Sequence, residues 1–358
     1  MDDLSYPYQC YNDDDIKNRV TYIEASRGCP FKCEFCLSSL DKTAYPFNLE
    51  SFLIEMEKLY QRGARHFKFV DRTFNLKIKN SLKVLDFFLD KKDPDLFLHF
   101  EVIPDHLPDA LKQKLILFPE GCLQFEVGIQ TFDTQVQKNI SRRQNNEKSK
   151  NNLIWLKQNT HAHIHADLIF GLPGETLQSF EQSFDQLYAC APHEIQMGIL
   201  KRLRGSPIIR HIEAFDMRFS PIPPYSILSN KDVSFEQMQQ INRFARYWDM
   251  IGNSGRFSHS LPWLLDDSPF ANFLKLADWL FHKTDQTHRI NLKRLYELVA
   301  MACENLFPRQ YDELIKALEI DFQRSKLKGS FALLQVTNRP RKSPIKNKQS
   351  LRQQRHQA

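Results

Sequence analysis

Six apolar runs of strand length alternate with amphipathic helical stretches, and this alternation limits the fold more than any other feature of the sequence. Strict alternation of strand and helix predicts a parallel sheet with right-handed crossovers. Six units are too few for a closed (β/α)8 barrel. We therefore expect an α/β fold built as a partial (β/α)6 TIM-like barrel. The six runs cover residues 20–26, 66–71, 96–103, 123–130, 163–171 and 194–203.

The pattern changes beyond Pro224, where helical stretches follow one another without clear strands. The three stretches span residues 234–253, 270–284 and 291–306. This change predicts a second, helical domain. The expected division of the chain is a linker at 1–18, the partial barrel at 19–210, a helical C-terminal domain at 211–336 and a basic disordered tail at 337–358.

Composition and charge exclude several classes of protein. Hydrophobic residues make up 42% of the 358 residues, which is typical of a globular chain. No apolar run approaches the ~20 residues that cross a membrane, and the acidic N-terminus does not resemble a secretory signal. We expect a cytoplasmic protein with no membrane partner. The tail holds seven Lys and Arg and no acid, so its charge of +7 exceeds the net charge of +6 of the whole chain. The rest of the chain is therefore close to neutral and is not a general polyanion binder.

Three of the seven cysteines lie close together in the stretch SRGCPFKCEFC. Cys29, Cys33 and Cys36 have the spacing C-x3-C-x2-C and follow the first predicted strand, at the barrel face that carries active sites. A closed zinc site takes four ligands, and the nearest later histidine is His66. Three soft thiolates instead match a [4Fe–4S] cluster that leaves one iron open to another molecule.

With Phe35 directly before the last cysteine, the motif resembles that of the radical S-adenosylmethionine (SAM) superfamily. The stretches FEVIP, EVGIQTFDTQVQKNISRRQ and HADLIFGLPGET extend this resemblance over about residues 20–210. They are similar to stretches of the oxygen-independent coproporphyrinogen oxidases of that superfamily. By position, the resemblance implies SAM contacts at Phe35, Glu101, Gln130, Arg142 and Asp167, with Arg143 as the alternative to Arg142.

The chemistry of these residue types suits SAM. Asp and Gln side chains hydrogen-bond ribose hydroxyls, and a guanidinium pairs with the methionyl carboxylate. One stretch departs from the superfamily, because FVDRTFN stands where a Gly-Gly pair often approaches the SAM amino group. We expect Asp71 to meet that ammonium and Thr73 to add a hydroxyl. The alternative is an ion pair between Asp71 and Arg72.

Strand parity places further polar residues inside the barrel. His163 and His165 share a strand face with Asp167, and Glu126 shares one with Gln130. The expected result is a buried Glu126–His163 pair at the barrel floor.

The stretches SRGCPFKCEFCLSS, FVDRTFN and LPGET resemble one branch of the superfamily. Its members carry a cobalamin-binding domain before the barrel and a helical domain of unknown function after it. This chain begins at what looks like their interdomain linker and has no D-x-H-x2-G motif. Cobalamin is therefore implied only through a separate domain or partner protein; the alternatives are that the domain was lost or that the chain is a fragment.

The resemblance implies a radical SAM enzyme, either an oxidoreductase or a transferase. A flavodoxin or ferredoxin would supply an electron, the cluster would cleave SAM, and a 5′-deoxyadenosyl radical would abstract hydrogen from an unidentified substrate. Lys201 and Arg204 indicate an anionic substrate or a solvated loop. Two alternatives stay open: a coproporphyrinogen-oxidase-like or haem-binding relative, and a non-catalytic metal-binding module that interacts with RNA or protein.

Overall fold

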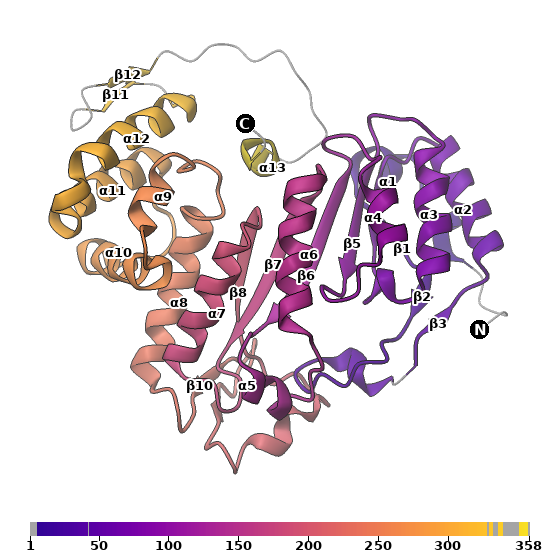
Figure 1. The fold of residues 1–358 in the computed structure, drawn as a ribbon, viewed down its shortest axis with the longest axis horizontal. Helices are drawn as coiled ribbons and strands as arrows, with labels where there is room; N and C mark the ends of the chain where they lie inside the picture. Colours follow the sequence, from indigo (N-terminus) through magenta and orange to yellow (C-terminus); the bar gives the residue numbers. More distant parts are fainter. Residues whose placement is uncertain (1–5, 42, 328, 332–335, 339–350, 357–358) are drawn as a thin grey trace.

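A six-stranded parallel sheet forms the centre of the computed structural model, which describes residues 6–41, 43–327, 329–331, 336–338 and 351–356 (Figure 1). The spatial order β1-β4-β5-β6-β7-β8 leaves β1 and β8 at the two edges, so the predicted partial barrel is confirmed. The strands are β1 (Thr21–Ile23), β4 (His66–Phe69), β5 (Phe97–Val102), β6 (Leu123–Gln130), β7 (His163–Phe170) and β8 (Glu194–Ile199).

Helices make the crossovers between these strands, as the alternation predicted. The helix α2 begins after Asn48, whose side chain accepts a hydrogen bond from the Ser51 N–H, and the chain leaves it at Gly63 with φ of +101°. The crossover helices are α2 (Leu49–Gln61), α3 (Ile78–Leu89), α4 (Asp109–Leu115), α5 (Thr134–Asn139), α6 (Asn146–Asn159) and α7 (Leu177–Ala189), with short turns η2 (Leu37–Leu40) and η3 (Phe74–Leu76).

The two faces of the sheet differ in polarity. Burial alternates strictly along β6, where Phe125 and Val127 are buried while Glu126 and Gly128 between them are partly exposed. The buried set packs under the helices, and each large apolar side chain removed from water there contributes about 1.5–3 kcal/mol. The partly exposed residues between them face the barrel interior, which is consequently polar.

The helical C-terminal part lies beside the β8 edge of the sheet, at the upper left of Figure 1. It packs on the barrel through aromatic rings: Phe184 of α7 lies 4.9 Å from Trp248 of α8 and 5.7 Å from Phe270 of α10, centroid to centroid. The two parts therefore share one hydrophobic core. The helices are α8 (Phe235–Met250), α9 (Ser260–Leu265), α10 (Pro269–Thr284), α11 (Leu292–Leu306) and α12 (Tyr311–Arg324), with the hairpins β9 (Arg218–Phe219)–β10 (Ile227–Ser229) and β11 (Gly329–Phe331)–β12 (Val336–Asn338).

The segment expected to be a linker packs on the barrel where it is described. It forms η1 (Pro7–Cys10) and α1 (Asp13–Asn18), and both contribute a buried side chain, Tyr8 and Ile16. The Tyr8 hydroxyl also accepts a hydrogen bond from the Glu24 N–H at 2.9 Å. These anchors hold the N-terminal segment against the chain just after β1.

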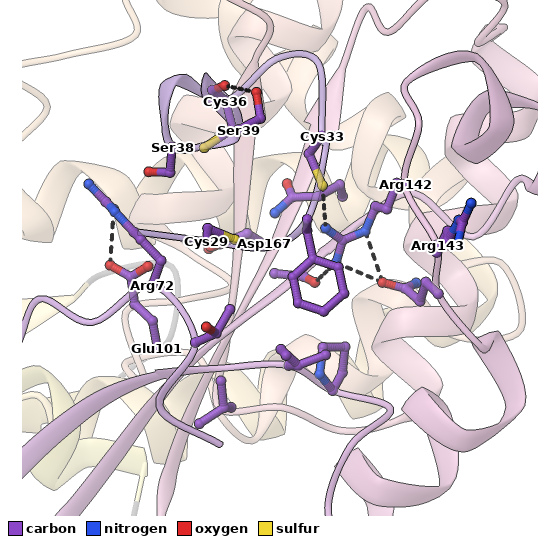
Figure 2. Close-up of a pocket in the computed structure, with 18 of the residues that line it drawn as sticks. Cys29, Cys33, Cys36, Ser38, Ser39, Arg72, Glu101, Arg142, Arg143 and Asp167 are labelled. Carbon is purple, nitrogen blue, oxygen red and sulfur yellow. Dashed lines mark hydrogen bonds and ion pairs between the residues drawn. The ribbon is translucent and has the colours of Figure 1, made fainter. Parts of the chain in front are cut away.

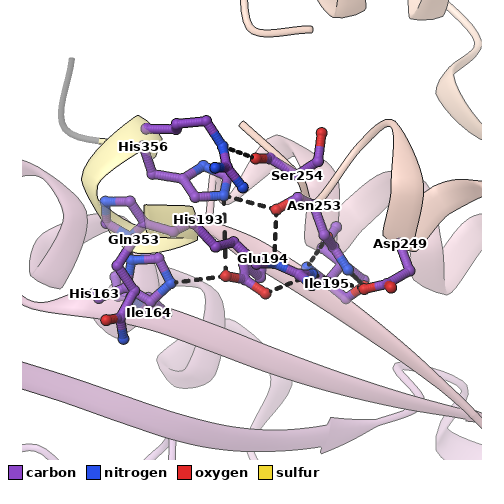
Figure 3. Close-up of polar contacts among 12 residues, drawn as sticks. His163, Ile164, His193, Glu194, Ile195, Asp249, Asn253, Ser254, Gln353 and His356 are labelled. Atoms are coloured by element: carbon purple, nitrogen blue, oxygen red, sulfur yellow. Dashed lines mark hydrogen bonds and ion pairs between the residues drawn. The ribbon is translucent and has the colours of Figure 1, made fainter. Parts of the chain in front are cut away.

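Part of the predicted disordered tail is folded. Residues 339–350 and 357–358 lie outside the described residues, but α13 (Leu351–His356) sits at the N-terminal ends of the strands, the base of the barrel (Figure 3). Arg352 Nη2 lies 2.7 Å from Glu194 Oε2, and His356 Nε2 lies 2.8 Å from the Asn253 carbonyl oxygen. The structure thus has a helix within the stretch for which the sequence predicts disorder, and Arg352 of this helix meets a buried carboxylate.

The loop after α8 also holds the edge strand β8. The carboxamide of Asn253 accepts a hydrogen bond from the Ile195 N–H and donates one to the Ile195 carbonyl oxygen, both at 2.9 Å.

Among the helices within the described ranges, none is both long and apolar enough to cross a membrane.

Candidate active site

The three cysteines lie on a loop that a short ribbon closes. The strands β2 (Ser26–Arg27) and β3 (Tyr45–Pro46) pair in antiparallel fashion at its base. Gly28 begins the loop with φ of +91°, and a Cβ atom there would lie 1.9 Å from the Thr43 carbonyl oxygen. Glycine is thus needed at this position for two reasons, the backbone conformation and the close approach.

All three cysteines line a single cavity of about 340 Å³ at the C-terminal ends of the strands (Figure 2). The opposite wall comes from β5, β6 and β7 and from the turn that follows α5. Six of the seven predicted SAM contacts line the same cavity: Phe35, Thr73, Glu101, Gln130, Arg142 and Asp167. The structure therefore brings together residues that are far apart in the sequence. Lys201 and Arg204 are not among the lining residues.

Gln130 reaches the cavity through an irregularity at the end of β6. The pairing of β6 with β7 shifts between Gly128 and Gln130, and Gln130 takes a positive φ of +69°. Such bulges re-aim side chains and are frequent beside active sites. A Cβ atom on Gly128 would lie 2.6 Å from Gln130 Nε2, so the glycine makes room for this amide. Gln130 Oε1 is buried without a hydrogen-bond partner in the described structure, which leaves an acceptor for a bound molecule.

Asp167 and Glu101 form an acidic wall opposite the cysteines. Burial raises the pKa of Asp167 to about 7, and the nearby carboxylates of Glu126 and Glu101 act in the same direction. Burial also raises the pKa of Glu101, although the Arg72 guanidinium, 3.3 Å away, opposes it. A hydroxyl donor or a cation bound beside these carboxyl groups would offset the cost of burying their charge.

The two adjacent arginines differ in their contacts. Arg142 Nη1 lies 3.6 Å from Cys33 Sγ, and the same guanidinium donates to the carbonyl oxygen of Gly128 and to Gln144 Oε1 (Figure 2). Arg143 lines the outer edge of the cavity, is exposed, and makes no ion pair or hydrogen bond among the described residues. Arg142 is thus a fixed cation beside a cysteine, and Arg143 is free to bind an anion.

Asp71 does not reach the cavity, contrary to the prediction. It is 2% exposed and accepts hydrogen bonds from the Ala25 N–H at 2.9 Å and the Ser26 hydroxyl at 2.6 Å. Its carboxylate thereby fixes the start of the cysteine loop, which explains why it turns away from the site. The alternative pair with Arg72 is also absent, since Arg72 pairs with Glu101.

The predicted Glu126–His163 pair is wrong. Glu126 Oε1 lies 3.0 Å from His99 Nε2 and 3.3 Å from Lys68 Nζ at the floor of the cavity. His163 lies deeper, 3.2 Å from Glu194 Oε1 at the barrel base (Figure 3). Parity placed both side chains on the inner face correctly, but the stagger of neighbouring strands sets them at different heights.

The donor set fits an iron–sulfur cluster better than a single ion. Within the described residues, no three His, Cys, Asp or Glu side chains converge closely enough to hold one metal ion. Three thiols spread around a common cavity suit a cluster in which each binds a different iron. The guanidinium beside Cys33 supplies positive charge to an anionic cluster. Cys29, Cys33 and Cys36 would therefore hold it.

Two functional candidates lacked a local sequence signal. Glu126 and Arg72 both line the cavity, whereas the sequence had named Glu126 only as a partner of His163 and Arg72 only as an alternative partner of Asp71. Glu34 lies inside the cysteine motif itself and is buried. The sequence feature that could have indicated it is an acidic residue between Cys33 and Cys36.

Comparison with known proteins now identifies the class. Residues 23–187 match the family described as the radical SAM superfamily, and residues 213–358 match a protein family of unknown function, DUF4080. Residues 23–187 therefore form a radical SAM domain. The expected helical region of unknown function behind the barrel is confirmed.

The curated relatives share only part of their length with this chain. A ribosomal protein uS12 methylthiotransferase of Pseudothermotoga lettingae is 26% identical over 183 residues, which cover 48% of this chain and 41% of the relative. A tRNA-2-methylthio-N(6)-dimethylallyladenosine synthase of Campylobacter jejuni is 24% identical over 200 residues, 52% of this chain and 46% of the relative. The match thus spans less than half of each relative.

Two solved structures share the fold over most of the chain. The radical SAM methyltransferase TsrM of Kitasatospora setae, solved with cobalamin and a [4Fe–4S] cluster, has a TM-score of 0.52 at 15% identity and covers 86% of this chain and 61% of its own. The cobalamin-dependent radical SAM enzyme OxsB, solved with aqua-cobalamin and SAM, has a TM-score of 0.50 at 12% identity and covers 85% and 53%. At these identities the likeness concerns the fold.

Proposed function

We propose that the chain is a radical SAM enzyme that cleaves SAM reductively and abstracts hydrogen from a substrate not yet identified. One observation carries this proposal: three cysteines line one wall of a cavity whose opposite wall presents Gln130, Asp167 and Glu101. When bound, a [4Fe–4S] cluster supplies the electron that cleaves SAM into methionine and a 5′-deoxyadenosyl radical. The protein itself binds, orients and shields the reactants.

Each wall residue has a role that follows from its contacts. Asp167 accepts hydrogen bonds from ribose hydroxyls, and the buried Gln130 Oε1 accepts one from an adjacent donor. Arg143 pairs with the methionyl carboxylate, because its guanidinium has no described partner. Arg142 holds Cys33 and balances the charge of the thiolates. Phe35 and Thr73 complete the enclosure.

Transfer of a methyl or methylthio group is a narrower proposal. One relative is named a ribosomal protein methylthiotransferase and the other a synthase of a 2-methylthio tRNA nucleoside, and the names of the two structural neighbours describe a methyltransferase and a cobalamin-dependent enzyme. For this chain, cobalamin enters through a separate domain or partner protein, and the electron donor is a flavodoxin or ferredoxin. Retention of haem by the purified protein would instead favour the haem-binding alternative, and salt-dependent RNA binding without SAM cleavage would favour the binding module.

The test is anaerobic SAM cleavage. The purified chain is reconstituted with iron and sulfide and reduced with dithionite in the presence of SAM, and 5′-deoxyadenosine is measured. We expect four irons per chain and turnover in the wild type, with both lost in Cys33→Ala. Cys190→Ala is the matched control, because Cys190 is also a buried thiol but lies at the end of α7. Equal cleavage in both variants would contradict the proposal.

A further inference from the structure

A cationic and apolar surface lies on the outer side of the cysteine loop. It is formed by two segments, residues 32–40 of the loop and residues 201–210 after β8, which we name the loop–η4 surface. Its exposed apolar side chains are Leu37, Leu40, Leu203 and Ile209, with exposed fractions of 43%, 57%, 37% and 59%. Its exposed cations are Lys32, Lys201, Arg204 and Arg210. Asp41, an exposed acid, marks its edge.

The two segments are fastened together by Glu34. This carboxylate is 2% exposed and accepts from the guanidinium of Arg210, which belongs to η4 (Pro207–His211), and from the hydroxyl of Ser141. His211 Nε2 lies 2.6 Å from its second oxygen. The backbone contributes as well, because the Ile208 N–H donates to the Glu34 carbonyl oxygen at 2.9 Å.

The surface is contiguous and its cations are mostly unpaired. A Cβ atom on Gly205 would lie 3.8 Å from Leu40 Cδ1, so the two segments approach each other there as well as at Glu34. Among the described residues, Lys32, Lys201 and Arg204 form no ion pair, and the Arg210 side chain is 60% exposed although its guanidinium reaches Glu34. Exposed apolar side chains together with positively charged ones are typical of a docking surface for an acidic protein.

We propose that the loop–η4 surface docks an acidic one-electron donor protein of the flavodoxin kind. This inference rests on the proposed function, which needs an electron at the cysteines. The transfer moves one electron: the donor is oxidised by one and the cluster is reduced by one, with no bond made or broken. Charge complementarity favours this occupant, and Cys33 and Cys36 belong to the same loop segment and line the cavity.

The experiment compares two double charge reversals in the full chain. Lys32→Glu with Arg204→Glu reverses the loop–η4 surface, and Lys283→Glu with Lys293→Glu is the matched control on the helical part, where both lysines are exposed. The affinity for a bacterial flavodoxin is measured by titration calorimetry at low and high salt, before any cluster is loaded. We expect at least a tenfold weaker Kd for the first variant and a shallower salt dependence.

Cluster reduction separates docking from the reaction. Reduced flavodoxin should reduce the loaded surface variant about tenfold more slowly than the wild type, while dithionite, which needs no docking, should reduce both at equal rates. Failure of dithionite-driven SAM cleavage in the wild type would refute the proposed function alone. Equal flavodoxin affinity in both double variants would refute the docking site. If the wild type self-associated and the first variant did not, the surface would bind a second copy of the chain. That result would also overturn the proposal.

Discussion

The two ends of the barrel carry similar polar side chains but differ in the hydrogen-bond and ion-pair partners of those side chains. At the base, Glu194 is matched by His163 and Arg352, and Asn253 satisfies both backbone groups of Ile195. At the mouth, Gln130 Oε1 has no partner in the described structure. Asp167 Oδ1 is 3.9 Å from its ion-pair partner, His165. At the base the chain supplies most of these partners, although His163 Nδ1 is buried without one, whereas at the mouth Gln130 and Asp167 line the cavity.

This difference shows where polar groups in an interior are structural. A buried polar group without a partner costs about 1–3 kcal/mol, so a chain retains it where a bound molecule completes it. The base therefore contributes to stability, and the mouth to binding.

Gly28→Ala should abolish cluster binding. The new Cβ would lie 1.9 Å from the Thr43 carbonyl oxygen, so the cysteine loop cannot close as it does. Gly63→Ala is the matched control, because Gly63 also has a positive φ, of +101°, but a Cβ there meets nothing within 4 Å. Iron content after reconstitution measures the effect. Retained iron in Gly28→Ala would show that the loop does not need this turn.

Asp167→Asn should stabilise the fold at pH 8 while weakening SAM binding. The folded-state pKa of about 7 exceeds the ordinary 3.8 because of burial, so ionisation costs stability as pH rises from about 4 to 7 and the full cost is present above 7. The variant removes that cost, which we estimate as about 2–4 kcal/mol.

Denaturant unfolding at pH 5 and pH 8 checks the sign for Asp167→Asn. The difference between variant and wild type should be larger at pH 8. A variant that is less stable than the wild type at both pH values would show that Asp167 is a structural group, like those of the base.

Glu194→Gln should have the opposite sign. Burial raises the pKa of Glu194, but the hydrogen bond from His163 and the charge of Arg352 outweigh it, so the pKa lies below the ordinary 4.5. Its stabilisation is therefore present above about pH 4.5 and is lost as pH falls through the lowered value. The variant should lose about 1–3 kcal/mol of unfolding free energy at pH 7. SAM affinity should not change, and a weakened SAM affinity would contradict the separation of the two ends.

Arg143→Ala should give the smallest effect. Loss of one exposed, charge-assisted contact to the methionyl carboxylate costs about 1 kcal/mol, or roughly a fivefold rise in Kd for SAM. Lys148→Ala, another exposed cation close by in α6, is the control. Equilibrium dialysis with SAM measures both. If Arg142→Ala rather than Arg143→Ala raised the Kd with iron content unchanged, the methionyl carboxylate would belong to Arg142.

Features with a local cause could be predicted from the sequence. The strand Leu123–Gln130 has the predicted bounds because its alternating pattern marks both ends. The cysteine loop was equally local. Gln130 and Asp167 were singled out by the family resemblance, and in the structure both line the cavity.

Features that depend on distant partners could not be predicted. Asp71 turned inward because the N–H of Ala25 and the hydroxyl of Ser26 are brought beside it by the fold. The helix α13 formed where sequence composition indicated disorder, because Glu194 offers it a buried anion. In each case the deciding interaction joins residues with no relation in the sequence pattern.

The bond between Asn253 and β8 has a consequence for the fate of the molecule in a crowded solution. An open sheet ends in an edge strand whose free backbone groups can recruit a strand from another chain. The Asn253 carboxamide occupies the N–H and the carbonyl oxygen of Ile195, the two groups that an incoming strand would need there. A side chain thus stands in for the missing neighbour, and the barrel stays open towards its ligands without inviting aggregation at Ile195.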